Sequence, residues 1–314
     1  MFFTGKRTLL AKEESVYGSD PTPVVGSNGI DAGRIEISHE AELGERNIMR
    51  GSLSPLDPVV GKKSVKLSFE VEIKGSGSAG TAPRLGDLIE ACGFTETVSA
   101  GSSVVYLPSS TTMKSVTFYL YDLADSGSMV LHKVNGARGT FQINAKAGEI
   151  AKMLFTFYGI YNIPTDVADP GVPTAEGTKP PVVESAAFTL NGVTSLVVDE
   201  VSLDMQNSVI TADDISSVNG IKSFNITARK PSGKFSPEAV AMATYDFWTD
   251  WVAGTARALS LIIGGTAGNK LTLSLPKVTI DSIAAGDKQG ILTRELPFRA
   301  SQNTGNDEVR LSFS

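Results

Sequence analysis

The segment Ser64–Lys74 constrains the fold of this chain more than any other part of the sequence. Apolar side chains at positions 65, 67, 69, 71 and 73 alternate there with Lys, Ser and Glu. Strict alternation places one face of a strand against a core and the other in water, as in an antiparallel sheet. Ser223–Arg229 repeats this alternation with Phe224, Ile226 and Ala228. The sequence therefore predicts a mainly β protein.

Further strands are expected along most of the chain. They are short and separated by clusters of Gly, Asn, Asp or Ser, which is typical of a β-sandwich or barrel. The remaining strand candidates are 115–122, 129–134, 139–145, 152–161, 257–263, 270–275, 277–283, 291–299 and 308–313.

Two segments carry helical signals. Pro83–Cys92 is a short candidate that is followed by a glycine. Ser236–Ala253 is the stronger one, because apolar residues recur in it at helical spacing. Ser236 suits the N-cap, Pro237 the first helical position and Gly254 the end of this helix.

A proline-rich segment divides the chain. Ile163–Pro181 holds five of the fifteen prolines, and at that density we expect an extended linker without stable strand or helix. The prediction is two tandem antiparallel β-sandwich or barrel domains, residues 31–162 and 182–314, each with one flanking α-helix. Residues 1–30 precede them as an N-terminal arm.

The two halves resemble each other in the order of their elements. A glycine-led segment enters the first strong strand of each half, at Gly61 and at Gly220. A helix, an apolar strand and a hairpin partner follow. Each half then reaches Ala-Gly plus an acid, Ala147–Glu149 and Ala285–Asp287, before a long strand. A repeat of this length indicates duplication of a whole domain; the alternative is that two unrelated antiparallel domains share the same strand order by chance.

Composition and motifs argue against catalysis. The chain has 28 basic and 34 acidic residues and a net charge of −6, which disfavours tight binding of nucleic acid. Cys92 is the single cysteine and is expected to be a small buried hydrophobe. His39 and His132 are the only histidines, too few for a usual zinc site. Gly75–Gly80 matches G-x-G-x-x-G, but it follows a half-wet strand and is interpreted as a flexible link. We expect no enzyme activity, no cofactor, no metal and no membrane partner.

Residues 40–62 form a long segment with many apolar side chains before the first strong strand. Pro55 and Pro58 bar a regular helix in it. A long loop of this composition either folds back or packs on a partner. Its apolar residues are Leu43, Ile48, Met49, Leu53, Leu56, Val59 and Val60.

Both ends of the chain resemble a known family. The residues that carry the resemblance are Lys12–Pro23 (KEESVYGSDPTP), Gly26–Ile30, Leu275–Ile280, Gln289–Ala300 (QGILTRELPFRA) and Asn306–Phe313. They are similar to segments of the major tail (tail tube) proteins of long-tailed, non-contractile bacteriophages. Inner tube proteins of contractile tails share the fold class.

The resemblance implies a structural role in a virion tail that is assembled in the bacterial cytoplasm. Its members are β-sandwiches with a flanking helix that close into stacked rings, and DNA leaves the capsid through the channel without specific binding. Most have one such domain and form hexamers. Two domains in this chain would give three copies per ring with pseudo-sixfold symmetry; a plain hexamer is the alternative. Further implied partners are the tape measure, tail terminator and distal tail proteins.

The resemblance also implies where copies touch. Loop Leu43–Val60 and arm Met1–Ile30 would make the contacts between rings. The expected contact residues are Leu43, Ile48, Met49, Leu53, Leu56, Val59, Val60, Tyr17, Pro21 and Pro23. The competing hypothesis is a β-sandwich module that binds a carbohydrate or a receptor without catalysis.

Overall fold

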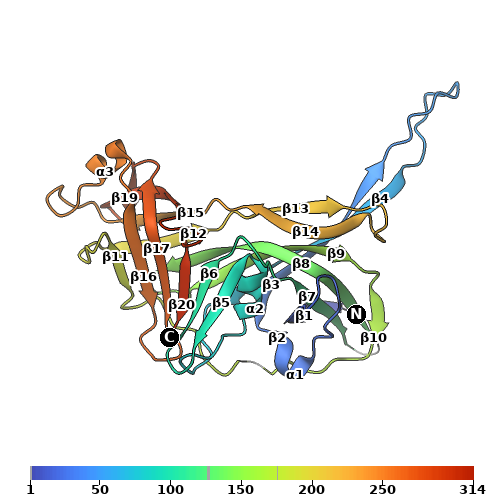
Figure 1. The fold of residues 1–314 in the computed structure, drawn as a ribbon, viewed down its shortest axis with the longest axis horizontal. Coiled ribbons are helices and arrows are strands. Elements are labelled where there is room, and N and C mark those ends of the chain that lie inside the picture. The colour runs from blue at the N-terminus through green and yellow to red at the C-terminus, as the bar shows by residue number, and fades with distance from the viewer. Residues whose placement is uncertain (1, 126–127, 175) are drawn as a thin grey trace.

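A computed structural model describes residues 2–125, 128–174 and 176–314 and shows a mainly β, antiparallel protein (Figure 1). Within the described residues the only helices are three short ones, α1 (Val25–Asn28), α2 (Gly86–Ala91) and α3 (Phe247–Ala253). None of these helices has the length and apolar character needed to cross a membrane.

Six strands of the first half follow one another across a curved sheet, each antiparallel to its neighbours. They are β1 (Phe2–Glu13), β3 (Ala32–Gly44), β4 (Val59–Glu72), β7 (Val116–Ala124), β8 (Met129–Lys146) and β9 (Lys152–Tyr161). Their order across the sheet is β3–β4–β9–β8–β7–β1.

Six strands of the second half are arranged in a corresponding way. They are β11 (Ala187–Leu190), β12 (Val198–Asp204), β15 (Ser232–Pro237), β16 (Arg257–Ile263), β17 (Leu271–Ile280) and β19 (Ile291–Ala300). Their order is β12–β15–β19–β17–β16–β11, again antiparallel throughout.

Each half contains a long hairpin at one side of this order. In the first half it is β3–β4. In the second half β12 leads into β13 (Ser208–Asp213), which pairs with β14 (Ile221–Ala228), and β14 leads back into β15. The β3–β4 hairpin extends away from the body, whereas β13–β14 runs along it (Figure 1).

The remaining strands connect or extend these two sets. β2 (Gly29–Ile30) pairs with β1, and β10 (Thr165–Val167) with β8. β18 (Ala284–Lys288) pairs with β19. The last strand, β20 (Arg310–Phe313), pairs with both β17 and β6 (Ser103–Pro108), which in turn pairs with β5 (Phe94–Ser99).

One sheet and one core join the two halves. The end of β8, Gln142–Lys146, pairs antiparallel with Glu200–Asp204 of β12. A single cluster of buried apolar residues includes Phe69 and Phe157 of the first half with Phe235 and others of the second. Because each fully buried side chain of this size contributes roughly 1.5–3 kcal/mol, the shared core stabilises both halves together.

Phenylalanines fill the middle of the first sheet because the alternating pattern turns them all to one face. The rings of Phe69 and Phe155 stack at 5.8 Å between centroids, and those of Phe118 and Phe157 lie 4.8 Å apart. Cys92 is fully buried, as predicted, and burial raises the pKa of its thiol.

The expected helix over Ser236–Ala253 is wrong in its first half. Ser232–Pro237 is strand β15, held between β12 and β19. The helix begins only at Phe247, and the Asp246 carboxylate accepts hydrogen bonds from the backbone N–H groups of Trp248 and Thr249. Its predicted end is confirmed, because Gly254 adopts the left-handed conformation with φ 60°.

Most predicted strands are confirmed, and the differences from the prediction include these four. Candidates 129–134 and 139–145 are the single strand β8, with a register shift between Asn135 and Arg138. Likewise 270–275 and 277–283 fall largely into one strand, β17. The expectation of no strand in Ile163–Pro181 is wrong, because β10 pairs there with Met129–Leu131. Finally, Phe2–Glu13 forms β1, although these residues show no period-two pattern.

Candidate assembly surface

The outer part of the β3–β4 hairpin stands clear of the sheet. β4 pairs with β9 from Ser64 to Glu72, whereas its pairing with β3 continues outward to the Gly44–Val59 pair. Residues 45–58 join the two strands at the tip without forming strand. Among the described residues, strand pairing in the outer hairpin is therefore confined to its own two strands, and it projects from the body in Figure 1.

Apolar side chains cover this projecting part without being buried. Met49 and Leu53 are fully exposed, at 102% and 106%. Leu43, Ile48, Val59 and Val60 are each more than half exposed, and only Leu56 is partly covered. The seven apolar residues expected in the loop thus lie together on the hairpin. Apolar groups gathered on a surface mark an interaction site, because folding of the single chain leaves them in water.

The expected contact residues of the N-terminal segment lie against their own chain. The Tyr17 hydroxyl donates to the Gly136 carbonyl (2.8 Å) and accepts from the Phe224 N–H (2.8 Å). Its ring faces the Arg138 guanidinium at 4.8 Å. Burial raises the pKa of Tyr17 to about 12. This tyrosine therefore ties the N-terminal segment to β8 and β14.

Pro21 and Pro23 follow in the same segment. The Pro21 carbonyl accepts a hydrogen bond from Lys12 Nζ at 2.9 Å, and Pro23 is buried. Just before them, the buried Glu14 carboxylate accepts from the N–H groups of Gly18 and Gly136, both at 2.7 Å. Sequence reasoning missed Glu14, because its partners are scattered along the chain.

A second exposed apolar area lies at α3. Trp248 and Trp251 remain about two fifths exposed, and Ile291 and Leu292 beside β18 are half exposed. The Arg294 guanidinium lies 5.6 Å from the Trp248 ring. Both tryptophans fall within the helix that was predicted over Ser236–Ala253. The structure leaves much of each ring uncovered.

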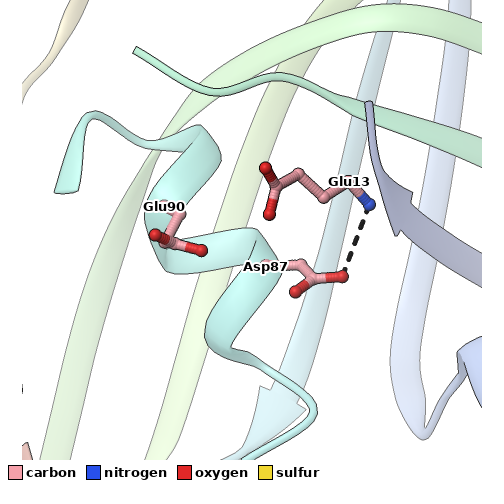
Figure 2. A group of neighbouring side chains, drawn as sticks. All are labelled: Glu13, Asp87 and Glu90. Atoms are coloured by element: carbon pink, nitrogen blue, oxygen red, sulfur yellow. Dashed lines mark hydrogen bonds between the residues drawn. The ribbon is translucent and has the colours of Figure 1, made fainter. Parts of the chain in front are cut away.

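Three carboxylates that could hold a cation meet beside α2 (Figure 2). The ligand atoms of Glu13, Asp87 and Glu90 lie within 4.8 Å of one another. Lys114 already supplies a positive charge, because its Nζ lies 2.9 Å from oxygens of both glutamates. Burial raises the pKa of Asp87. The set is therefore a partly exposed cluster in which one lysine pairs with two of the three carboxylates, and no sequence spacing could have revealed it.

The glycines of Gly75–Gly80 have a packing role. The Gly75 N–H donates to Asn269 Oδ1 at 2.8 Å, and the Gly77 N–H donates to the Gly268 carbonyl at 3.0 Å. A Cβ on Gly75 would lie 2.1 Å from that carbonyl oxygen. Two loops from different halves approach so closely that only glycine fits, which replaces the interpretation of a merely flexible link.

These features describe a β scaffold with uncovered apolar surfaces. Comparison with known families identifies the family of the chain. A family model described as phage tail tube protein matches residues 4–300. The chain belongs to the phage tail tube protein family. No curated protein matches the chain.

As a tail tube protein the chain is a structural component of the virion tail and is not an enzyme. Membership also implies that copies assemble with one another into a tube. An assembling protein needs surfaces that the single chain leaves open, and the β3–β4 hairpin and the α3 area are such surfaces. The apolar content of residues 40–62 was the sequence signal for the first of them. For the second, the two tryptophans were visible but their exposure was not.

Proposed function

We propose that this tail tube protein contains two tube domains, residues 31–162 and 182–314, joined by linker 163–181, and that three chains close a pseudo-sixfold ring. The repeated strand order supports the duplication: β3–β4–β9–β8–β7–β1 corresponds to β12–β15–β19–β17–β16–β11. Gly61 lies near the start of β4, and Gly220 lies in the turn directly before β14, where each hairpin returns.

The junction inside the chain supplies a pattern for the contact between chains. At that junction the end of β8 pairs with β12, which opens the second set of strands. β17 corresponds to β8, and β3 corresponds to β12. Among the described strands β3 pairs with β4 alone and β18 with β19 alone, so each has a free edge. Pairing of β3 with the β17–β18 edge of the next copy would repeat the internal junction around the ring.

The hairpin then serves the contact between rings. Leu43–Val60 projects from the body with apolar side chains exposed, and a neighbouring ring would cover them. Arm residues Tyr17, Pro21 and Pro23 would contribute to this contact indirectly, because they hold the N-terminal segment in one position on the body. The terminator and distal tail proteins would meet the end rings, and the tape measure protein would occupy the channel before DNA does.

The channel would let double-stranded DNA pass without holding it. Phosphates bind strongly to surfaces rich in Lys and Arg. A chain with a net charge of −6 can line a channel without such a surface. The resemblance of the chain ends to proteins of long, non-contractile tails supports placing the tube in such a tail.

Electron microscopy of the assembled protein tests both parts of the proposal. End-on views of negatively stained rings should show three chains per ring; six would overturn the duplicated arrangement. The double variant Met49→Asp, Leu53→Asp should form rings that do not stack, because charge would be buried at the contact between rings. Val172→Asp is the matched control, since Val172 is 90% exposed in the linker and should leave stacking unchanged. Tubes of normal length from the double variant would contradict the role of the tip.

A further inference from the structure

The two histidines of the chain pack against each other at the base of the projecting hairpin. His39 lies on β3 and His132 on β8, and their ring centroids are 5.3 Å apart with an angle of 41°. The ring of Tyr161, at the end of β9, meets His39 edge-on at 5.7 Å. His39 pairs across the hairpin with Val65, within the part of β4 that joins the sheet. The pair thus sits where the hairpin leaves the body.

Hydrogen bonds fix the orientation of His132. Its Nε2 lies 3.2 Å from Asp122 Oδ2, and Asp122 Oδ1 lies 2.8 Å from Arg7 Nε. Because a carboxylate only accepts, the neutral ring carries its proton on Nε2. Nδ1 is buried and has no hydrogen-bond partner among the described residues. Arg7 also donates to the Ile35 carbonyl (3.0 Å), so this chain of contacts reaches back to β3.

A positive charge on this pair of rings would be poorly balanced by the groups around it. The charged or titratable groups that face the two rings are Arg7 of β1, Asp122 of β7 and Tyr161 of β9, together with Lys63 of β4 on the face that carries His39. Asp122 is the only carboxylate among them, and Arg7 already neutralises it. Partial desolvation of the otherwise exposed His39 ring lowers its pKa, and a charge on His132 lowers it further.

We propose that the His39–His132 pair is a pH-sensitive latch that holds the base of the β3–β4 hairpin against β8 and β9. Neutral rings pack together and fix β3. Protonation of His39 places a positive charge against the His132 ring, whose buried Nδ1 has no hydrogen-bond partner among the described residues, so β3 separates from the body.

The direction of the pH effect follows from the contact of His39 with the His132 and Tyr161 rings, which partly desolvates its exposed side chain. In the unfolded or opened state its pKa is near the ordinary 6.5, and in the closed state it is lower. The opened state therefore binds more protons, and the latch loses stability as the pH falls below this ordinary value. Above it, both states are neutral and the latch is closed.

Hydrogen exchange of the full-length, unassembled chain tests the latch. After correction for the intrinsic pH dependence of exchange, amides of β3 should exchange several-fold faster at about pH 5.5 than at about pH 7.5. Amides of β16, far from the pair, should keep the same corrected rate. His39→Gln and His132→Gln should each remove the response in β3. Equal corrected rates at both pH values in the unsubstituted chain would overturn the proposal.

A second measurement keeps the test independent of how the variants fold. With two histidines, the chain gives two imidazole signals in NMR titrations. His132→Gln should raise the titration midpoint of the remaining His39 signal, because a neighbouring charge is removed. An unchanged midpoint would contradict the pairing.

The latch bears on assembly only through the proposed role of the hairpin. If that role is correct, tubes should form less readily at about pH 5.5, and His39→Gln should restore assembly there. Tubes that form equally well at both pH values while β3 exchange responds would contradict the proposed role of the hairpin and keep the latch. Exchange without a pH response, in a chain that forms tubes, would contradict the latch alone.

Discussion

The two long hairpins hold corresponding places in the strand order but meet different surroundings. The β3–β4 hairpin projects with its apolar residues in water, whereas the β13–β14 hairpin lies along the body (Figure 1). Ile221, Phe224 and Ile226 of β14 are buried. The apolar side chains on the outer part of the first hairpin are exposed. Whether a hairpin projects or lies along the body thus depends on what its side chains contact, because the strand pairing is similar in both hairpins.

Polar contacts complete the attachment of the second hairpin. Arg138 Nη1 donates to the Phe224 carbonyl and to Asn225 Oδ1, both at 2.8 Å. Asn219 Nδ2 donates to the Tyr161 carbonyl at 2.8 Å. Arg138 reaches the hairpin from β8, so the first half of the chain holds the second hairpin in place. The first hairpin has no equivalent set of contacts along its outer part among the described residues.

The largest effect is expected from Phe224→Ala. Removing a buried aromatic ring costs about 3–5 kcal/mol, and here it would free the second hairpin so that it resembles the first. Urea unfolding measures the change in the free energy of unfolding. Ile210→Ala is the matched control, because Ile210 lies on β13 and is half exposed. Equal unfolding midpoints for the two variants would show that apolar burial does not hold the hairpin.

A smaller effect is expected from Tyr17→Phe. The variant keeps the ring but leaves the Phe224 N–H without its acceptor, which costs about 1–3 kcal/mol. Its pH dependence is also distinctive. Because burial raises the pKa of Tyr17 from 10.0 to about 12, its contribution is complete below pH 10.0 and is lost as the pH rises toward 12.

The stability difference between the parent chain and Tyr17→Phe should therefore shrink in alkaline solution. Comparing the two chains cancels the titration of the other tyrosines. A difference that stays constant from neutral pH to about pH 11 would argue against a buried, neutral hydroxyl at this position.

The smallest effect is expected from Lys62→Met. Lys62 Nζ and Asp213 Oδ2 form an ion pair at 2.5 Å between the two hairpins, but both side chains are accessible to solvent. Salt screens such a pair, so the variant should differ from the parent chain only at low ionic strength. Unfolding curves at low and high salt provide the measurement. A large difference that persists in high salt would mean that this pair helps to hold the second hairpin down.

The sequence predicted the elements whose pattern is local. Ser64–Lys74 alternates because one face of β4 meets the core, and 152–161 and 257–263 match their strands to the residue. The buried part of β1, Thr8–Ala11, was invisible because both of its faces are covered: Leu9 belongs to the main core and Leu10 to a small second cluster. A strand covered on both sides has no alternation to read.

Where the prediction of an element was wrong, pairing between distant segments of the chain determines the structure. Ser236 and Pro237 suit a helix start as well as a strand end, and only the pairing of β15 with β12 and β19 selects the strand. The apolar loop was predicted because it needs no partner within the chain to be recognised. The Glu13–Asp87–Glu90 cluster and the histidine pair are assembled by the fold from distant positions, so no motif announces them.

The shared sheet has a consequence for the integrity of the chain. β8 pairs with β12, and β20 returns to pair with β6, so two strand junctions and the common core join the halves. A protease cut at the exposed Val172 would leave these joints intact, and the two fragments should copurify as a noncovalent complex. During folding, the linker acts by raising the effective concentration of one half near the other. Once the chain has folded, the halves stay together through their own strand pairs and core.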